Sequence, residues 1–261
     1  MIIISEKLNS SIPSSKKLME NGTDEEIREF IQLQSECGAS YLDLNAAMCA
    51  DEVNTAKRIA DLIIEQGECG IAVDSPSEEA MEAILEYVGE RCDVLINSVT
   101  LSERQGNIAL ASKYNAGIIA VLTDESGSPD TAEKRLANAD EIIKRIREAG
   151  IPDDKIYIDV IAETAAVEDK AAACALETVR LVHEKYENVH ITCGLSNISF
   201  GLPERKVLNS AFFAAAAVLG MDAPICDITS PSIKNSFAAT KILLGEDDYC
   251  MEYIEEMRST K

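Results

Sequence analysis

Eight short apolar segments recur along the chain, and each precedes a longer stretch in which apolar residues have helical spacing. The segments are Met1–Ile4, Tyr41–Leu44, Gly70–Val73, Val94–Ile96, Gly117–Leu122, Ile156–Ile158, Val189–Leu195 and Ala223–Cys226. Such runs, often rich in β-branched residues, are typical of parallel strands covered on both faces. The strict alternation of strand and helix predicts a parallel sheet, and eight repeats favour closure into a (β/α)8 TIM barrel, an α/β fold.

The helical stretches carry start and stop signals. The motif T-x-x-E at residues 23–26 predicts a capping box that opens a helix, and Gly38 ends it. The motif S-P-x-E at residues 75–78 predicts a second box, with proline at the first helical position. Apolar stripes mark two further helices, at Val53, Ala56, Ala60 and Ile63 and at Leu136, Ala139, Ile142, Ile143 and Ile146.

Composition and charge narrow the class of protein. The chain has no linker and no change of composition, so we expect one domain over residues 1–261. Its 24 basic and 46 acidic residues give a net charge of −22, which argues against nucleic acid or an anionic membrane as partner. There is no C-x-x-C pair among eight cysteines, no signal peptide, and no apolar run long enough to cross a bilayer. We therefore expect a reduced, cytoplasmic protein.

A polar side chain follows the apolar run of each predicted strand. These residues are Glu6, Asn9, Asp43, Asn45, Asp74, Asn97, Thr123, Asp159, Asn197 and Asp227. The carboxyl ends of barrel strands converge on one rim, so the pattern predicts a single polar site there. Buried carboxylates need hydrogen-bond donors, and a neutral heterocycle with a guanidine-like edge, such as a pterin, supplies adjacent N–H groups.

Helix capping is the structural alternative for these rim residues. Asp51 and Asp130 are expected to be N-caps, and Asp74, just before residues 75–78, could partly be one. For any single rim residue capping and ligand binding are equally good interpretations, but capping is a poor explanation for the whole set.

Several common catalytic motifs are missing. His183 and His190 are the only histidines, and both fit structural roles in a helix and at a strand start. The sequence has no H-E-x-x-H, no Cys/His cluster with zinc spacing and no G-x-S-x-G, and we predict no bound metal. It also lacks a P-loop, a G-x-G-x-x-G after a strand and a strand-end lysine suited to a Schiff base.

Six segments in barrel order resemble the pterin-binding methyltransferase family. They are residues 3–9 (IISEKLN), 41–45 (YLDLN), 73–75 (VDS), 95–98 (LINS), 157–159 (YID) and 194–201 (GLSNISFG), the last followed by Arg205 and Asn209. That family includes the methyltetrahydrofolate:corrinoid methyltransferases and the folate module of cobalamin-dependent methionine synthase. The resemblance runs from Met1 to about Cys250 and implies a TIM barrel of the dihydropteroate synthase-like type.

The resemblance also implies roles for individual residues. Asp74, Asn97 and Asp159 look like the pterin-binding set, and Asn197 looks like the mobile, catalytic asparagine that reaches the pterin N5. Further expected folate contacts are Glu6, Asn9, Asp43, Ser196, Phe200, Arg205 and Asp227. The sequence departs from the family pattern in two places: Ser5 replaces the usual glycine, and Phe200 stands where some stand-alone members have glutamine.

The reaction implied is an SN2 methyl transfer between N5 of tetrahydrofolate (or 5-methyltetrahydrofolate) and the cobalt of a corrinoid (cobalamin). The chain looks closest to stand-alone members that pass methyl groups from a methylated corrinoid protein to tetrahydrofolate, in anaerobic one-carbon metabolism. Neither histidine lies in a D-x-H-x-x-G motif, so the corrinoid is expected on a separate partner protein. The resemblance further implies a homodimer.

Three other functions are alternatives to this interpretation. Dihydropteroate synthase would need a Gly-rich loop with Ser-Thr-Arg-Pro after the second strand, where this chain has Asn-Ala-Ala-Met at residues 45–48. A non-catalytic folate-binding component of a corrinoid complex would keep the pocket without the reaction. A generic aldolase or phosphate-binding barrel would need a rim lysine and a Gly-rich loop near the seventh or eighth strand.

Overall fold

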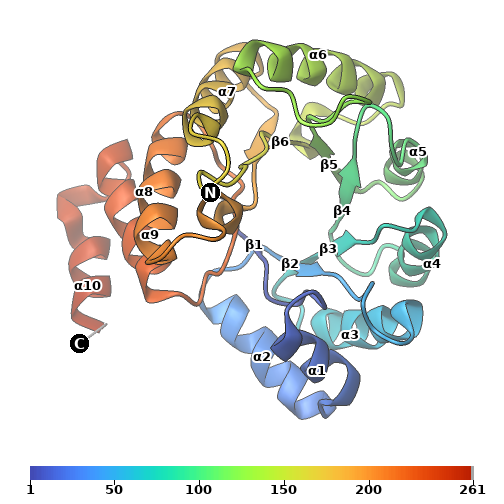
Figure 1. The fold of residues 1–261 in the computed structure, drawn as a ribbon. Coiled ribbons are helices and arrows are strands. Elements are labelled where there is room, and N and C mark those ends of the chain that lie inside the picture. Colours follow the sequence, from blue (N-terminus) through green and yellow to red (C-terminus); the bar gives the residue numbers. More distant parts are fainter. Residues whose placement is uncertain (260–261) are drawn as a thin grey trace.

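In the computed structural model, which describes residues 1–259, eight parallel strands form a ring surrounded by helices (Figure 1). The strands are β1 (Ile4–Ser5), β2 (Tyr41–Leu44), β3 (Gly70–Asp74), β4 (Val94–Val99), β5 (Gly117–Val121), β6 (Ile156–Asp159), β7 (His190–Thr192) and β8 (Ile225–Cys226). They pair in the order β7-β6-β5-β4-β3-β2-β1-β8. The ring closes between β7 and β8, where the Ile225 N–H donates to the Cys193 carbonyl at 3.0 Å. The predicted TIM barrel is confirmed.

The helices lie outside the strands, as expected when both faces of a parallel sheet are covered. They are α1 (Pro13–Asn21), α2 (Asp24–Glu36), α3 (Glu52–Gln66), α4 (Glu78–Val88), α5 (Gly106–Lys113), α6 (Ala132–Glu148), α7 (Ala171–Lys185), α8 (Arg205–Val218), α9 (Pro231–Leu244) and α10 (Met251–Ser259). Helix α10 packs on α9, outside the ring (Figure 1). None of the helices found between residues 1 and 259 has both the length and the apolar character needed to cross a bilayer.

Two predicted helix starts are confirmed. Thr23 and Glu26 form the capping box of α2, with the Glu26 N–H donating to Thr23 Oγ1 at 3.3 Å and the Thr23 N–H to Glu26 Oε2 at 2.8 Å. Asp51 caps α3 by accepting from the Asn54 N–H at 3.1 Å. In both cases the side chain satisfies an N–H group that has no partner within the helix.

Two other predicted starts are wrong. Helix α4 is capped by Ser77, because the Ser75 hydroxyl donates to a glutamate of α3 at 2.6 Å and Pro76 stays outside the helix. Helix α6 is capped by Thr131, while Asp130 forms an exposed ion pair with the lysine four residues later. In each case a nearby residue, Ser77 or Thr131, has the backbone position from which its hydroxyl reaches a free N–H group of the helix.

The side chains that point into the barrel form two layers, an apolar layer in the interior and a mainly polar layer at the carboxyl ends of the strands, which we call the rim. Inside the barrel, the buried cluster consists of Ile4, Ala72, Leu95, Ile119, Tyr157, Ala223 and Ile225, with Tyr41 packed against it. Residues two apart in a strand face the same side, so the next inward positions lie two residues further on. These positions hold Glu6, Asp43, Asp74, Asn97, Val121, Asp159 and Asp227.

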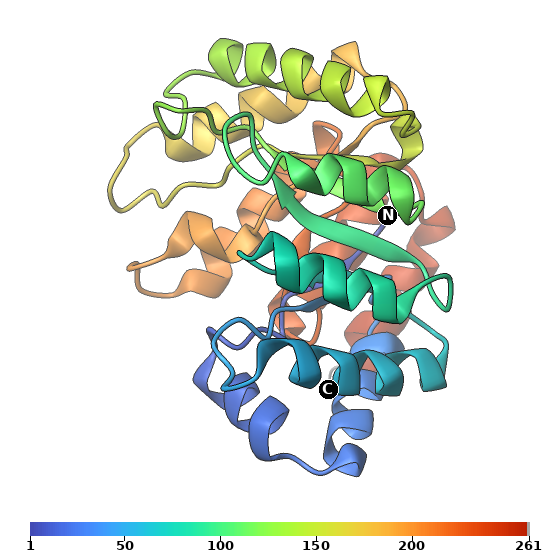
Figure 2. The ribbon, with the colours of Figure 1, turned by 90° about the vertical axis from the view of Figure 1, so that its right-hand side faces the viewer.

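The seventh strand is shorter than predicted. It ends at Thr192 rather than Leu195, and Leu195–Ser199 form a 3-10 turn, η2. Leu195 and Ile198 bury the inner side of this turn, which leaves Asn197 exposed at its outer side. Two shorter 3-10 turns are η1 (Asp153–Lys155) and η3 (Asp248–Cys250). Figure 2 shows the long loops gathered at one end of the barrel, which is the end that carries the polar rim.

Candidate active site at the carboxyl end of the barrel

Strand register decides which rim side chains meet. Asp74 and Asn97 are paired residues of β3 and β4, so they lie at the same height in the barrel. Asp43 is paired with Ala72 and therefore lies one layer deeper, where it is 3% exposed.

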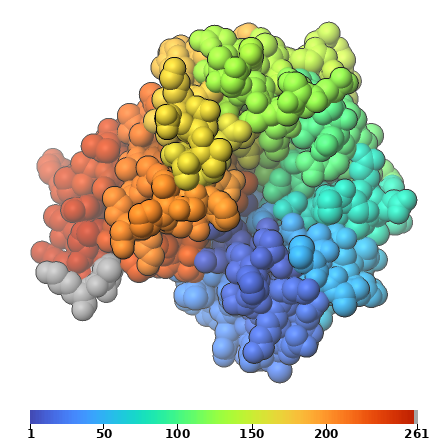
Figure 3. All heavy atoms as spheres, in the orientation of Figure 1, coloured from blue at the N-terminus to red at the C-terminus, as the bar shows by residue number. Residues whose placement is uncertain are grey.

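Viewed onto this rim, the space-filling surface is hollowed between α1 on one side and the segment around residues 160–205 on the other (Figure 3).

Amide groups bind the carboxylates on the β2–β4 side of the rim. The two oxygens of Asp43 accept from Asn9 Nδ2 and Asn97 Nδ2, each at 3.3 Å. Asn45 Nδ2 donates to Asp74 Oδ2 at 2.8 Å, and Asn45 Oδ1 in turn accepts from a serine hydroxyl and a backbone N–H. These bonds fix the orientation of the amides. Asn97 is thereby turned so that its oxygen points away from Asp43.

The carboxyl groups of the rim are short of donors. Burial raises the pKa of Asp43, and the charge of Asp74 raises it further, against the opposing effect of two amide N–H groups. Burial likewise raises the pKa of Asp74. It raises the pKa of Asp159 to about 6, although the Ile161 N–H donates to Asp159 Oδ1 at 2.8 Å. A ligand that brought N–H donors would relieve this deficit.

Three acceptor atoms remain free on the β3–β6 part of the rim. Asp74 Oδ1, Asp159 Oδ2 and Asn97 Oδ1 have no hydrogen-bond donor among the described residues. All three side chains occupy inward strand positions. The site therefore offers acceptors to a ligand whose edge is rich in N–H groups.

Asn197 is held differently, by the turn η2 rather than by a strand. Its side chain is exposed and makes no hydrogen bond with the described residues. A Cβ atom at Gly194 would lie 2.9 Å from Asn197 Nδ2, so glycine leaves the asparagine room there. Arg205 braces the turn: its Nη2 donates to the Ser196 carbonyl at 2.6 Å and its Nε to Ser199 Oγ at 3.1 Å.

The remaining predicted contacts lie beside this turn, around β1 and β8. The Ser196 hydroxyl donates to Glu6 Oε2 at 3.0 Å, and burial raises the pKa of Glu6. Asp227 accepts from Thr229 Oγ1 at 2.6 Å and pairs with Lys7 at 2.8 Å. Glu6 and Asp227 thus each bind a side chain of the protein, whereas Asp159 accepts only a backbone N–H.

Phe200 projects from the end of the same turn. Its side chain is 67% exposed, and the Arg205 guanidinium lies over its ring at 5.8 Å. Its carbonyl accepts from Thr164 Oγ1 at 2.6 Å, which ties η2 to the loop between β6 and α7. Phe200 therefore belongs to the outer lip of the site rather than to its base.

Two arginines that the sequence did not suggest support the rim. Arg135, 1% exposed, donates to the carbonyls of Pro129, Val160 and Ile161 and so fixes the backbone after Asp159. The sequence does contain an indication that Arg135 is buried, because it lies on the apolar stripe of α6, four residues before Ala139.

Arg104, in the loop after β4, had no comparable signal. It adopts a left-handed backbone with φ of 52° and donates from Nη2 to Ser98 Oγ at 3.1 Å. Its Nε is buried without a partner among the described residues, and its charge partly opposes the rise that burial causes in the pKa of Asp74.

The histidines lie apart from this site. His190, on β7, is inward at the opposite end of the barrel, where Nδ1 lies 2.7 Å from the Asp222 carboxylate, a contact that raises its pKa. His183 packs against Gly220. Across residues 1–259 no three His, Cys, Asp or Glu side chains are grouped so that they could hold a metal ion.

Comparison with known proteins places this geometry in a family. The family described as pterin binding enzyme matches residues 8–227. A methylcorrinoid:tetrahydrofolate methyltransferase of Eubacterium limosum is 32% identical over 266 residues, covering 100% of this chain and 97% of the relative. The methionine synthase of Mycobacterium tuberculosis is 30% identical over 86% of this chain, which corresponds to 20% of that longer protein.

Solved structures support the fold. A Yersinia pestis dihydropteroate synthase with a pterine-sulfa conjugate superposes with a TM-score of 0.70 over 94% of this chain and 93% of its own, at 13% identity. The enzyme from Stenotrophomonas maltophilia gives 0.66 over 94% and 92%, at 16% identity. Together with the family match over residues 8–227, these findings establish that the chain belongs to the pterin-binding enzymes.

Proposed function

We propose that this protein transfers a methyl group between N5 of tetrahydrofolate and the cobalt of a corrinoid carried by a partner protein. The methylated corrinoid protein would be the donor and tetrahydrofolate the acceptor. The full-length similarity to a methylcorrinoid:tetrahydrofolate methyltransferase supports this choice. The match to one region of methionine synthase, a longer protein, is consistent with a folate-binding unit that works with a separately held corrinoid.

The observation that carries the proposal is the set of three free acceptors beside the unpartnered Asn197. A reduced pterin presents N–H donors along its pyrimidine edge and at N8. These donors complement Asp74 Oδ1, Asp159 Oδ2 and Asn97 Oδ1. With that edge toward β3–β6, N5 lies on the opposite side of the heterocycle, toward η2 and Asn197.

Methyl transfer requires a lone pair on N5 that is aligned with the methyl carbon. The N5 lone pair forms the new bond to carbon while the carbon–cobalt bond breaks, and N5 then loses its proton to solvent. When its protein is docked, the corrinoid supplies the methyl carbon and retains the electron pair of the broken bond. The Asn197 side-chain oxygen accepts the N5–H, which aligns the lone pair and stabilises the positive charge that develops on N5.

The partner protein would dock over the rim, because the reacting N5 faces outward there. The outer lip offers Phe200 and Val167, which is 84% exposed. The hydrogen bond from Thr164 Oγ1 to the Phe200 carbonyl joins their two loops into one projecting surface. Apolar groups beside an open mouth are suited to cover a corrin ring and exclude water from the transfer.

We also propose a homodimer. Exposed apolar side chains gather near the carboxyl ends of α8 and α9, at Val218, Leu243 and Leu244. Light scattering of the purified protein should give twice the chain mass of 28.3 kDa. A monomer at micromolar concentration would contradict this part of the proposal.

A spectroscopic assay tests the reaction itself. The protein is mixed anaerobically with tetrahydrofolate and methylcobalamin, and we expect conversion of methylcobalamin to cob(I)alamin with formation of 5-methyltetrahydrofolate. Asn197→Ala should bind tetrahydrofolate and fail to convert it at the wild-type rate. Binding without any transfer by the wild-type protein would identify a non-catalytic folate-binding component. Absence of binding would remove the proposed function altogether.

A further inference from the structure

One inward position of the rim is held by Thr192, the last residue of β7. Its register partner on β6 is Asp159. One pair earlier along the same face, the rings of Tyr157 and His190 lie against each other with centroids 4.6 Å apart. Residues two apart in a strand face the same side, so the side chains of Thr192 and Asp159 lie side by side inside the barrel.

The Thr192 hydroxyl is fully buried and has no partner. Thr192 is 0% exposed, and its Oγ1 makes no hydrogen bond with any described residue. A buried hydroxyl without a hydrogen bond is destabilising, because it has given up its bonds to water. Such a group is rare in folded proteins and points to a role in the site beside it.

The neighbouring Asp159 is short of a donor. Its Oδ1 accepts the Ile161 N–H at 2.8 Å, whereas its Oδ2 has no donor among the described residues. Burial raises the pKa of Asp159 to about 6, and a second donor would favour the ionised carboxylate. A hydroxyl without a partner therefore lies next to a carboxylate oxygen without a donor.

The geometry of paired strands allows the two groups to meet. Neighbouring strands lie about 4.7–4.9 Å apart, a distance that a threonine hydroxyl and an aspartate carboxylate on the same face can bridge. A rotation of Thr192 by about 120° around χ1, from one staggered rotamer to the next, exchanges its hydroxyl and its methyl group. The two groups are similar in size, so the exchange changes the surrounding packing little. The bond is strongest when Asp159 is ionised, which the N–H donors of a pterin favour.

We propose that Thr192 is a positioning residue for Asp159 and donates a hydrogen bond to Asp159 Oδ2 when tetrahydrofolate is bound, an inference that rests on the proposed function. Each oxygen of Asp159 then has a donor from the protein, so the plane of the carboxylate is fixed. The second lone pair of Oδ2 accepts the N–H of the ligand. Thr192 thereby does for Asp159 what Asn45 does for Asp74 on the other side of the rim.

Binding and rate measurements on Thr192 variants test this inference. Thr192→Val keeps the shape of the side chain and removes the hydroxyl, so calorimetry should show a tetrahydrofolate affinity ~5- to 10-fold below that of the wild type. The transfer rate at saturating tetrahydrofolate should stay within ~2-fold, because Asp159 acts on binding. Thr192→Ser keeps the hydroxyl and should bind tetrahydrofolate within ~2-fold of the wild type. A loss in Thr192→Ser as large as in Thr192→Val would overturn the inference.

A double-mutant cycle separates this role from packing. In Asp159→Asn the amide oxygen keeps the Ile161 N–H and the amide nitrogen replaces Oδ2, so the acceptor for the Thr192 hydroxyl is lost. In that background Thr192→Val should change the affinity by less than ~2-fold. Equal losses from Thr192→Val in the two backgrounds would show that the hydroxyl does not act through Asp159.

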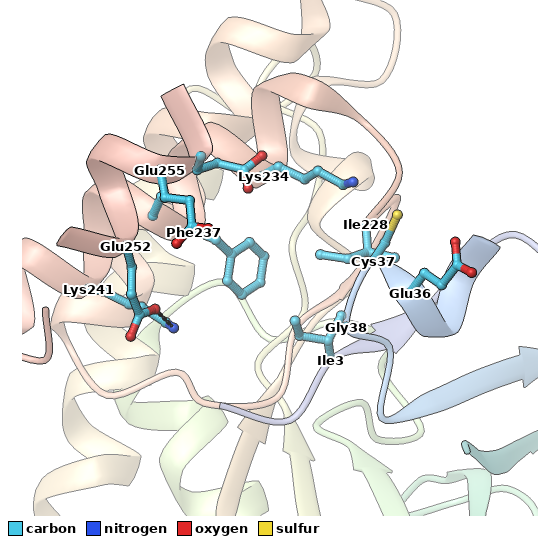
Figure 4. A pocket seen from close by; sticks show the side chains of 12 residues that line it. Ile3, Glu36, Cys37, Gly38, Ile228, Lys234, Phe237, Lys241, Glu252 and Glu255 are labelled. Carbon is cyan, nitrogen blue, oxygen red and sulfur yellow. Dashed lines mark hydrogen bonds and ion pairs between the residues drawn. The ribbon is translucent and has the colours of Figure 1, made fainter. Parts of the chain in front are cut away.

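Thr240→Val is the matched control. Thr240 is 1% exposed, and its hydroxyl also has no partner among the described residues. It belongs to α9, which lies outside the ring of strands and whose Phe237 and Lys241 line the cavity shown in Figure 4. The same chemical change there should leave tetrahydrofolate binding intact. A loss of affinity equal to that of Thr192→Val would overturn the inference.

Thermal unfolding without tetrahydrofolate supplies a second readout. Thr192→Val should unfold at the wild-type temperature or above it, because the variant removes a buried hydroxyl that no described residue bonds. A lower unfolding temperature would show that the hydroxyl is already bonded in the free protein, which contradicts the inference. If the wild-type protein did not bind tetrahydrofolate, the proposed function would fail first, so the two failures are distinguishable.

Discussion

The two sides of the rim hold their polar groups in different ways. On the β2–β4 side, Asp43 accepts from two amides, and a third amide holds Asp74 at 2.8 Å. On the β6–β7 side, Asp159 accepts one backbone N–H, and Asn197 makes no hydrogen bond with the described residues. The first side is a preformed template for a rigid ring. The second leaves its groups free for the reacting atom.

The difference follows from local structure. Asp74 and Asn97 sit in paired strands, so backbone hydrogen bonds on both sides fix their positions before a ligand arrives. Asn197 sits on a five-residue 3-10 turn that depends on Gly194 for space and on Arg205 for bracing. Short 3-10 segments have poorer hydrogen-bond geometry than strands, so this side can adjust at lower cost.

The largest effect on the reaction is expected at Asn197, which we propose to contact the reacting N5. Asn197→Ala should lower the methyl-transfer rate by ~10²-fold or more, because the amide oxygen acts on charge that develops only in the transition state. Tetrahydrofolate affinity should change little, since the template side remains complete. Single-turnover kinetics and calorimetry measure the two quantities separately. Equal losses in rate and affinity would show that Asn197 is a binding residue only.

Asp159 belongs to the same side but should act on binding. Asp159→Asn removes one free carboxylate oxygen, and a hydrogen bond to a charged group contributes about 1.5–3 kcal/mol, so affinity should fall ~10- to 100-fold. The rate at saturating tetrahydrofolate should fall much less. Asp130→Asn is a suitable control, because that aspartate is an exposed partner of Lys134. A rate loss as large as that of Asn197→Ala would erase the proposed division of roles.

The sequence predicted which residues reach the rim. It did not predict which of them are bound by amides of the protein and which keep free acceptor atoms. Period-2 alternation and parallel strands were enough to place Asp74, Asn97 and Asp159 on the inward side. The pairing of Asn45 with Asp74 depends on strand register, which no local pattern specifies.

Arg135 was missed because a charged residue is normally assigned to the solvent face of a helix, whereas here its guanidinium satisfies buried carbonyls. The turn η2 shows the same limit. Asn197 was expected after a strand that ended at Leu195, and only tertiary packing of Leu195 and Ile198 converts that segment into η2.

Acid should weaken binding through Asp159. Its pKa is about 6 in the folded protein, above the ordinary value of 3.8, so the carboxylate is lost as the pH falls through 6. Below pH 6 the affinity for tetrahydrofolate should fall up to ~10-fold per pH unit from this group. The ligand-free protein behaves oppositely, because the folded state binds this proton more tightly: the group adds stability as the pH falls from 6 toward 3.8.

Calorimetry at pH 7, 6 and 5 measures this dependence. Titration of the folate itself contributes equally to wild type and Asp159→Asn, so the difference between their pH profiles isolates the side chain. Identical slopes in the two proteins would exclude Asp159 as the titrating acceptor.

The smallest effect is expected on the template side, where one bond can be removed without touching the ligand. Asn45→Ala frees Asp74 Oδ2 and lets the carboxylate rotate, so tetrahydrofolate affinity should fall ~3- to 10-fold with the saturated rate unchanged. Ser10→Ala is the matched control, because it removes the hydroxyl bonded to Asn45 Oδ1 at 3.2 Å and leaves the bond to Asp74 in place. If Ser10→Ala lowered the affinity as much as Asn45→Ala, loss of loop packing rather than orientation of Asp74 would explain both variants, and the template side would not be preformed by its amides.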